Sequence, residues 1–261
     1  AHLAALETFV GLAYAAAVLS LASRWTRSET GPTWRDAIVP GLLFGLLLLT
    51  KIQAVLLPLP VAAWAMWHWR RRGGLPLATW SAIGLVVFIV GWPWLWHDVT
   101  GNLGEYFLGA TDRVSLSVWY FGDKLADRDV AWHYPLVMFA ISVPVGLHAL
   151  AIVGLARPRE SWRTDRRSQL VLAATLFPLL VFMIPGVAVY DGCRLFLVSF
   201  PLWAIAIGRG GVVTWEWLAR RVRPRTATVV VASFVLLQGW GLVRMHPCQL
   251  SYYNLLVGGT R

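Results

Sequence analysis

Lys51 is the charged residue whose place in the sequence is most informative. It ends an almost uninterrupted apolar run that begins at Gly41. A charge inside such a run is costly in a membrane, and residues of this kind mark functional sites by default. The ammonium group can hold a phosphate as a point charge. The alternative is that Lys51 lies at the tip of a helical hairpin and extends its long side chain to the membrane interface.

A second polar segment, residues 190–194, separates two apolar stretches. Arg194 begins the outgoing stretch, where its guanidinium can bind a phosphate or a carboxylate. The alternative is an Asp191–Arg194 ion pair that only caps the turn. The two cysteines, Cys193 and Cys248, permit a disulfide, and two free thiols are equally compatible with the sequence.

Two further places in the sequence could contribute residues to a site. Glu7 lies within the first apolar stretch, where an acid could bind a metal or act as a base, or could be an ordinary interface residue. His97 and Asp98 follow a tryptophan-rich segment and could ligate a metal, although helix capping is the simpler alternative. The sequence has no Cys-x-x-Cys, P-loop, Gly-x-Gly-x-x-Gly or Ser-His-Asp pattern.

Composition predicts a membrane protein. Apolar residues make up 57% of the 261 positions, charged residues make up 14%, and the mean hydropathy is +0.60. These values exclude disordered, fibrous and small disulfide-rich proteins, and most soluble enzymes. The net charge of +10 does not indicate a nucleic-acid partner, because the basic residues form short clusters between apolar runs.

The apolar runs predict an all-α polytopic membrane bundle with about eight transmembrane helices. The long run over 37–69 is expected to form a hairpin of two short helices with Lys51 near its tip. Residues 93–131 form the one long polar loop, in which the stretch 103–109 can form an amphipathic helix on the membrane surface. The other expected spans cover 1–23, 76–92, 132–156, 170–190, 195–213 and 226–244.

The distribution of Lys and Arg predicts the orientation. One set of alternating loops carries 16 of the 23 basic residues, which assigns that side to the cytoplasm. Lys51, Arg194 and the 93–131 loop then lie on the extracytoplasmic side, together with eight of the 13 acidic residues. Most of the polar chemistry is therefore expected outside the cytoplasm.

Several motifs, taken in order, resemble one family: the bacterial dolichyl-phosphate-mannose-protein mannosyltransferase-like proteins. These are GT-C type membrane glycosyltransferases related to the aminoarabinose transferase of lipid A. The similar segments include a glycine-spaced helix that ends in Thr-Lys, an Asp-Gly-x-Arg turn and a His-Pro-x-Gln-x-x-Tyr-x-Asn segment. Leu195 replaces the usual His of the turn. In chain order the motifs are Gly41–Lys51, Trp92–Asp98, Trp119–Gly122, Ala131–Pro135, Tyr190–Phe196, and His246–Asn254 with Gly258 and Gly259.

The resemblance implies transfer of a sugar from a polyprenyl-phosphate carrier to a protein hydroxyl, a lipid or a glycan outside the bacterial plasma membrane. It implies that Lys51 and Arg194 hold the carrier phosphate. Glu7 and Asp112 fall where relatives place acidic or metal-contacting residues, and Asp191 and His97 join them as expected contacts to substrate or to a divalent metal. The main catalytic Asp of the family would lie upstream of Ala1, so we expect this chain to be a GT-C domain fragment truncated at both ends.

Two other functions remain open at this point. A transporter or carrier-lipid flippase should place charges deep in several spans and show paired repeats, and the sequence shows few deep charges and no repeat. An inactive membrane scaffold related to the enzymes is the other alternative. An acidic pair in the upstream loop would favour catalysis.

Overall fold

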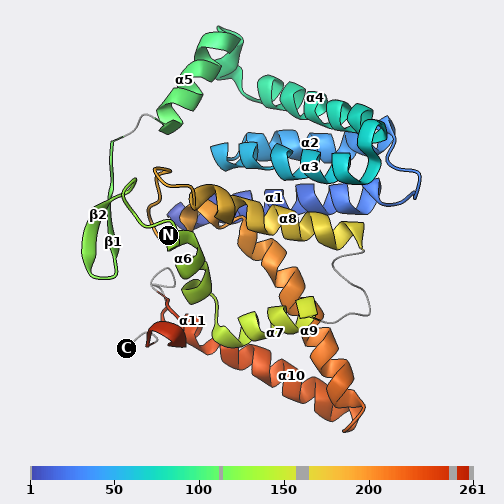
Figure 1. Ribbon diagram of the computed structural model, residues 1–261, viewed down its shortest axis with the longest axis vertical. Helices are drawn as coiled ribbons and strands as arrows, with labels where there is room; N and C mark the ends of the chain where they lie inside the picture. The colour runs from blue at the N-terminus through green and yellow to red at the C-terminus, as the bar shows by residue number, and fades with distance from the viewer. Residues whose placement is uncertain (1, 112–113, 157–164, 247–251, 259–261) are drawn as a thin grey trace.

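A computed structural model describes residues 2–111, 114–156, 165–246 and 252–258 of the protein. It is mostly helical, which confirms the all-α class (Figure 1). A two-stranded antiparallel hairpin is the sheet that the described residues contain. The elements are α1 (His2–Trp25), α2 (Ile38–Leu48), α3 (Pro58–Trp69), α4 (Gly74–Gly91), α5 (Val99–Thr111), β1 (Ser117–Tyr120), β2 (Asp123–Ala126), α6 (Tyr134–Ser142), α7 (Val145–Ala156), α8 (Arg166–Phe182), α9 (Ser199–Ala219), α10 (Pro224–Gln238) and α11 (Trp240–Arg244).

Helix α1 lies at the centre of the first half of the bundle. It packs against α2, α8 and α9, while α3 packs against α8 (Figure 1). Its buried face carries Tyr14, Leu21 and Trp25, all fully buried, and the Tyr14 hydroxyl donates to the Ala174 carbonyl at 3.0 Å. Helix α9 crosses away from this half and joins α7 and α10. The N-terminal part of α1 is thereby held next to α2 and α9.

The glycine-spaced segment of α2 forms a close contact with α4. A Cβ atom at Gly45 would lie 2.4 Å from the Val87 Cβ and 2.7 Å from the Gly84 carbonyl oxygen. A Cβ at Gly41 would lie 2.9 Å from the Ile83 Cβ. Helix packing of this kind requires small residues where two backbones approach. The glycines therefore fix the position of α2, and with it the position of the loop that follows.

The expected hairpin over 37–69 is present as two short helices, α2 and α3. The Thr50 hydroxyl donates to the Leu47 carbonyl at 2.6 Å and ends α2, and Lys51 takes an extended backbone conformation. A 3-10 turn over Ile52–Leu56 then leads to Pro58 at the start of α3. Lys51 is therefore held at the tip of the hairpin, as predicted.

The prediction of one helix over 132–156 is wrong. Helices α6 and α7 meet at a bend of 106°. Pro144 stands directly before α7, and a proline disfavours a helical backbone conformation at the residue that precedes it. Asn254, 1% exposed, stabilises the bend, because its Nδ2 donates to the carbonyls of Ala140 at 2.7 Å and Val143 at 2.6 Å. The helix expected over 170–190 also ends early, at Phe182.

The 93–131 loop has more structure than expected. Its predicted helix is present as α5, and the Asp98 carboxylate accepts from the Gly101 backbone N–H at 2.9 Å at the start of that helix. The hairpin β1–β2 was not predicted. Its tight turn places Phe121 at φ 51° and Gly122 at φ 95°. Alternate residues of β1 are buried against α6, which anchors the loop to the bundle.

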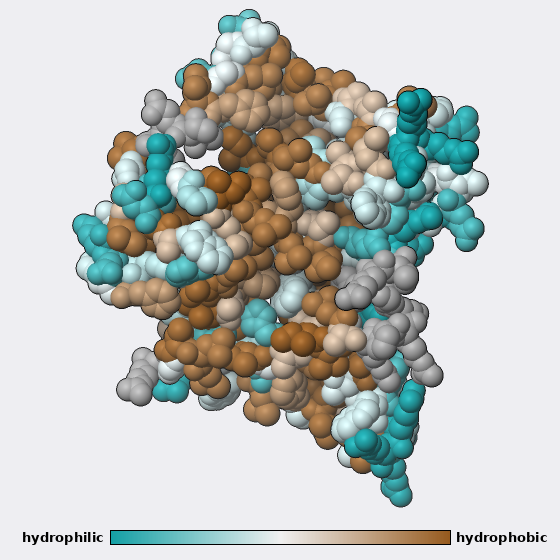
Figure 2. Space-filling view, viewed as in Figure 1, coloured by the Kyte–Doolittle hydropathy of each residue, from teal (hydrophilic) through white to brown (hydrophobic). Residues whose placement is uncertain are grey.

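Among the described residues, two stretches are long and apolar enough to cross a membrane, Glu7–Trp25 and Ile52–Gly91. Helices α6 and α7 would add a third if the bent pair forms one span. Large apolar side chains cover much of the surface (Figure 2), among them Leu12 at 65% exposed and Leu236 at 76% exposed. Such an extensive exposed apolar surface is compatible with an integral membrane protein.

Candidate functional site

A single carboxylate, that of Glu7, lies between two cations. The Lys51 Nζ donates to both carboxylate oxygens, at 2.6 and 2.8 Å, and the Arg194 Nε donates to Oε1 at 2.8 Å. The three residues are separated by 44 and 187 positions in the sequence. The fold therefore brings together two residues expected to hold a phosphate and one expected to contact substrate or metal.

Each of the three side chains comes from a different element. Glu7 lies on α1, Lys51 follows α2, and Arg194 begins the 3-10 turn Arg194–Phe196 that leads into α9. Because α1 packs against both α2 and α9, the three groups converge on one point. Side-chain exposure rises from 10% for Glu7 to 16% for Lys51 and 30% for Arg194. The site thus opens toward solvent on the Arg194 side.

Asp191 completes the cluster. Its carboxylate accepts from the Arg194 Nη1 at 3.0 Å, so the ion pair considered from the sequence is present. Asp191 lies at φ 53° and Gly192 at φ 66°, and the Gly192 N–H donates to the Tyr134 hydroxyl at 3.1 Å. Two consecutive residues with left-handed backbone are uncommon outside glycine and concentrate at functional sites. The turn presents Arg194 toward Glu7.

Lys51 and Arg194 are both charged donors to the Glu7 carboxylate. The hydrogen bond to Glu7 raises the pKa of Arg194, burial opposes this increase, and the bond to Asp191 adds to it, so the guanidinium stays charged. Two fixed cations that converge on one carboxylate can also converge on a phosphate oxygen, because both are anionic acceptors of charge-assisted hydrogen bonds. An entering phosphate would compete with Glu7 for Lys51 and Arg194.

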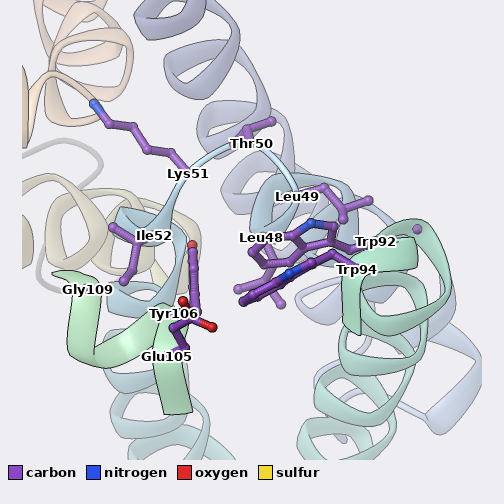
Figure 3. A pocket seen from close by; sticks show the side chains of 11 residues that line it. Leu48, Leu49, Thr50, Lys51, Ile52, Trp92, Trp94, Glu105, Tyr106 and Gly109 are labelled. Carbon is purple, nitrogen blue, oxygen red and sulfur yellow. The ribbon is translucent and has the colours of Figure 1, made fainter. Parts of the chain in front are cut away.

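A cleft of about 780 Å³ lies beside Lys51 (Figure 3). Aromatic rings form one wall, since Trp92 lies 5.2 Å from Trp94 and 5.1 Å from Tyr106 between ring centroids. Glu105 of α5 adds a carboxylate. The Lys51 stem lines the cleft and its ammonium points away from the tryptophans (Figure 3), in agreement with its bond to Glu7.

The remaining expected site residues are not part of this cluster. His97 is exposed after the 3-10 turn Pro93–Trp96, and no hydrogen bond or ion pair joins it to Glu7, Lys51 or Arg194 in the described ranges. Asp112 and Cys248 lie outside the described residues, and Cys193 is a half-buried free thiol. The sequence did not single out Tyr134 or Tyr106 for the site.

The cluster does not fit a divalent cation in its present arrangement. Both Glu7 oxygens accept hydrogen bonds from cations, and Asp191 is paired with Arg194. In the described part of the chain, no group of three or more His, Cys, Asp and Glu side chains is placed to hold a metal.

Comparison with known proteins leaves the geometry as the guide to function. No family model, no curated protein and no solved structure matches this chain.

Proposed function

We propose that this chain is the membrane-embedded part of a glycosyltransferase that uses a polyprenyl-phosphate-linked sugar. The observation that carries the proposal is the convergence of Lys51 and Arg194 on the Glu7 carboxylate. A carrier phosphate needs fixed cations that are partly shielded from water, and these two side chains provide them. The order of the motifs and the aromatic cleft beside Lys51 add support.

The chemistry requires stabilisation of the leaving group. When the bond between the sugar anomeric carbon and the phosphate oxygen breaks, negative charge grows on the phosphate, and the acceptor hydroxyl forms the new bond. Lys51 and Arg194 would stabilise that charge, which is usually the largest catalytic contribution available. A base must take the proton of the acceptor hydroxyl.

In the proposed membrane arrangement, α2 and α3 each make one pass and α6 with α7 make one. With α1, α4, α8, α9 and α10, this gives about eight passes. Helix α3 has 12 residues and is about 18 Å long, shorter than the ~30 Å hydrocarbon core. Lys51 at the tip of this hairpin would then lie below the extracytoplasmic surface, at the level of the carrier phosphate.

The test is transfer of radiolabelled sugar from several polyprenyl-phosphate donors by the whole protein in membrane vesicles. We expect Lys51→Ala and Arg194→Ala to abolish transfer while the protein remains folded. Lys124→Ala is the matched control, because Lys124 is an exposed cation of β2. Loss of activity in the first two variants alone would support the phosphate-binding role.

Other results would overturn the proposal. If the wild-type protein transfers no label from any donor, a transporter, a flippase or an inactive scaffold becomes the better explanation. If both variants match the wild type, Lys51 and Arg194 do not hold the phosphate. If Lys124→Ala loses as much activity as Lys51→Ala, the loss follows from removing any positive charge and not from removing a phosphate ligand.

A further inference from the structure

A second group of cations lies at the opposite end of helices α1 and α3 from Lys51. The turn Arg70–Gly73 carries three consecutive arginines between α3 and α4, and all three are exposed. Hydrophilic residues gather at this end of the molecule, on the right in Figure 2. Arg24 and Arg27 at the end of α1, Arg35, and Arg166 and Arg167 of α8 lie in the segments that meet there.

Arg70, Arg71 and Arg72 border a cleft of about 560 Å³. The cleft is lined by the segment Trp67–Arg72 and by Glu29 and Thr30 of the loop after α1. Glu29 is the acidic residue of the lining, and no ion pair joins it to Arg70, Arg71 or Arg72 in the described residues. Three cations against one carboxylate leave the cleft with an excess of positive charge.

Trp69 provides an independent indication of an anionic ligand. The residue lines the cleft, is only 6% exposed, and its Nε1–H has no hydrogen-bond acceptor among the described residues. A buried donor without an acceptor costs roughly 1–3 kcal/mol, and such a group calls for an explanation, of which an unseen ligand is one. The ring is held in place, because a Cβ at Gly31 would lie 2.7 Å from it and the Arg166 guanidinium lies 5.6 Å from its centroid.

The backbone at Arg70 is also unusual. Arg70 ends α3 at φ 47° and ψ −126°, a region that residues with a side chain rarely adopt. Strain of this kind persists where surrounding structure imposes it, and it concentrates at ligand-binding turns. Here it turns the chain sharply, so that three guanidinium groups follow directly after Trp69 on one 3-10 turn.

We propose that this cleft binds the phosphate group of an anionic membrane lipid. Guanidinium groups bind phosphate oxygens with paired hydrogen bonds, and the buried Trp69 N–H, which lacks an acceptor among the described residues, is a second type of donor beside the cleft. A lipid suits the site better than a free anion, because Trp67 is 82% exposed and Leu75 is 64% exposed beside the arginines. Tryptophan with a basic cluster is typical of the headgroup level of a membrane. This site lies apart from Lys51 and does not depend on the proposed sugar transfer.

The experiment titrates the whole protein in neutral detergent with short-chain phosphatidylglycerol, short-chain phosphatidylcholine and inorganic phosphate, and follows binding by native mass spectrometry and thermal stability. We expect phosphatidylglycerol to bind at least tenfold more tightly than phosphatidylcholine. The triple change Arg70→Gln, Arg71→Gln and Arg72→Gln should lower the affinity for phosphatidylglycerol at least about tenfold, because the lipid phosphate loses its charge-assisted hydrogen bonds. The control neutralises three exposed arginines of another cluster, Arg220→Gln, Arg223→Gln and Arg225→Gln, and should change affinity less than twofold.

Two additional variants keep the test decisive if the triple variant does not fold. Arg71→Gln alone should weaken phosphatidylglycerol binding about fivefold, because one charge-assisted hydrogen bond to the phosphate is lost. Trp69→Phe keeps a ring and removes the N–H, and should weaken binding at least about threefold through the lost hydrogen bond. Equal losses in the two triple variants would overturn the proposal in favour of general charge attraction. Equal stabilisation by inorganic phosphate and phosphatidylglycerol would overturn the lipid as the occupant.

Discussion

Replacing Glu7 with glutamine tests whether Lys51 and Arg194 form a site for an anion. The change keeps the shape of the side chain and removes the negative charge that both cations now share. Lys51 would then lose its carboxylate partner, and among the described residues Arg194 would keep only Asp191 as a counter-charge. We expect the protein to lose stability and to recover it when phosphate is added, because phosphate can occupy the same position.

The size of the effect follows from burial. Removing one partner of a buried ion pair costs about 3–5 kcal/mol, and we take the lower end because Arg194 keeps 30% of its side chain exposed. For a chain of 150–250 residues, about 1 kcal/mol corresponds to a change of about 2–4 °C in Tm, so Glu7→Gln should lower Tm by about 6–12 °C. Phosphate at 100 times its Kd would return about 2.7 kcal/mol. Wild-type protein should gain less at the same phosphate concentration, because phosphate must first displace the Glu7 carboxylate from Lys51 and Arg194.

The assay is thermal unfolding in detergent, followed by size-exclusion chromatography, with phosphate compared with chloride at equal ionic strength. Glu105→Gln is the matched control, because Glu105 is an exposed acid of the neighbouring cleft. Glu105→Gln should keep the wild-type Tm. The reasoning is refuted if Glu7→Gln is as stable as the wild type, or if chloride restores its stability as well as phosphate does.

Three further predictions follow from the packing and the helix caps. Asn254→Ala should lower the free energy of unfolding by about 2–3 kcal/mol, because two carbonyls at the α6–α7 bend lose their hydrogen-bond donor. Amide hydrogen exchange over residues 140–146 should increase in this variant, and unchanged exchange would contradict the prediction. Gly45→Ala should lower the free energy of unfolding by about 1–3 kcal/mol, because the added methyl group overpacks against Val87. Gly104 has open space around it, so Gly104→Ala should instead stabilise α5 by up to about 1 kcal/mol. Thermal unfolding of the two variants would measure both effects. The hydrogen bond from the Gly101 N–H, and after it that from the Thr100 hydroxyl, lowers the pKa of Asp98 from its usual value of 3.8. The unfolded chain therefore binds the proton more readily than the folded one. The stabilisation of α5 by the Asp98 carboxylate should be complete above pH ~4 and be lost only as the pH falls further. Amide NMR of Gly101 would measure it, and a loss near neutral pH would contradict the assignment.

The elements around Lys51 could be predicted from the sequence because the signals are local. The apolar run that ends at Lys51 and the two prolines that follow it predict a helical hairpin. The pairing of Glu7 with Lys51 and Arg194 could not be predicted, because it depends on how α1 packs against α2 and α9. The same limitation applies to His97, because the residues next to it in the sequence do not indicate how far it lies from Glu7, Lys51 and Arg194 in the fold.

Two features were missed although the sequence contains a signal for them. Pro144 marks the bend between α6 and α7, but the continuous apolar composition on both sides favoured one long helix. The hairpin β1–β2 is short, and its alternation of buried and exposed residues around Gly122 is too brief to outweigh the polar composition of the loop. Both corrections change the surroundings of the site and leave its cations in place.

The most direct test of the central claim is equilibrium binding of a short-chain polyprenyl phosphate, compared with the polyprenyl alcohol of the same length. We predict that the wild-type protein binds the phosphate at least about 30-fold more tightly, because the phosphate can displace the Glu7 carboxylate and accept charge-assisted hydrogen bonds from Lys51 and Arg194, whereas the alcohol cannot. The double variant Lys51→Met and Arg194→Gln should lose this preference and still bind the alcohol. Equal binding of the two lipids by the wild type, or an unchanged preference in the double variant, would contradict the account.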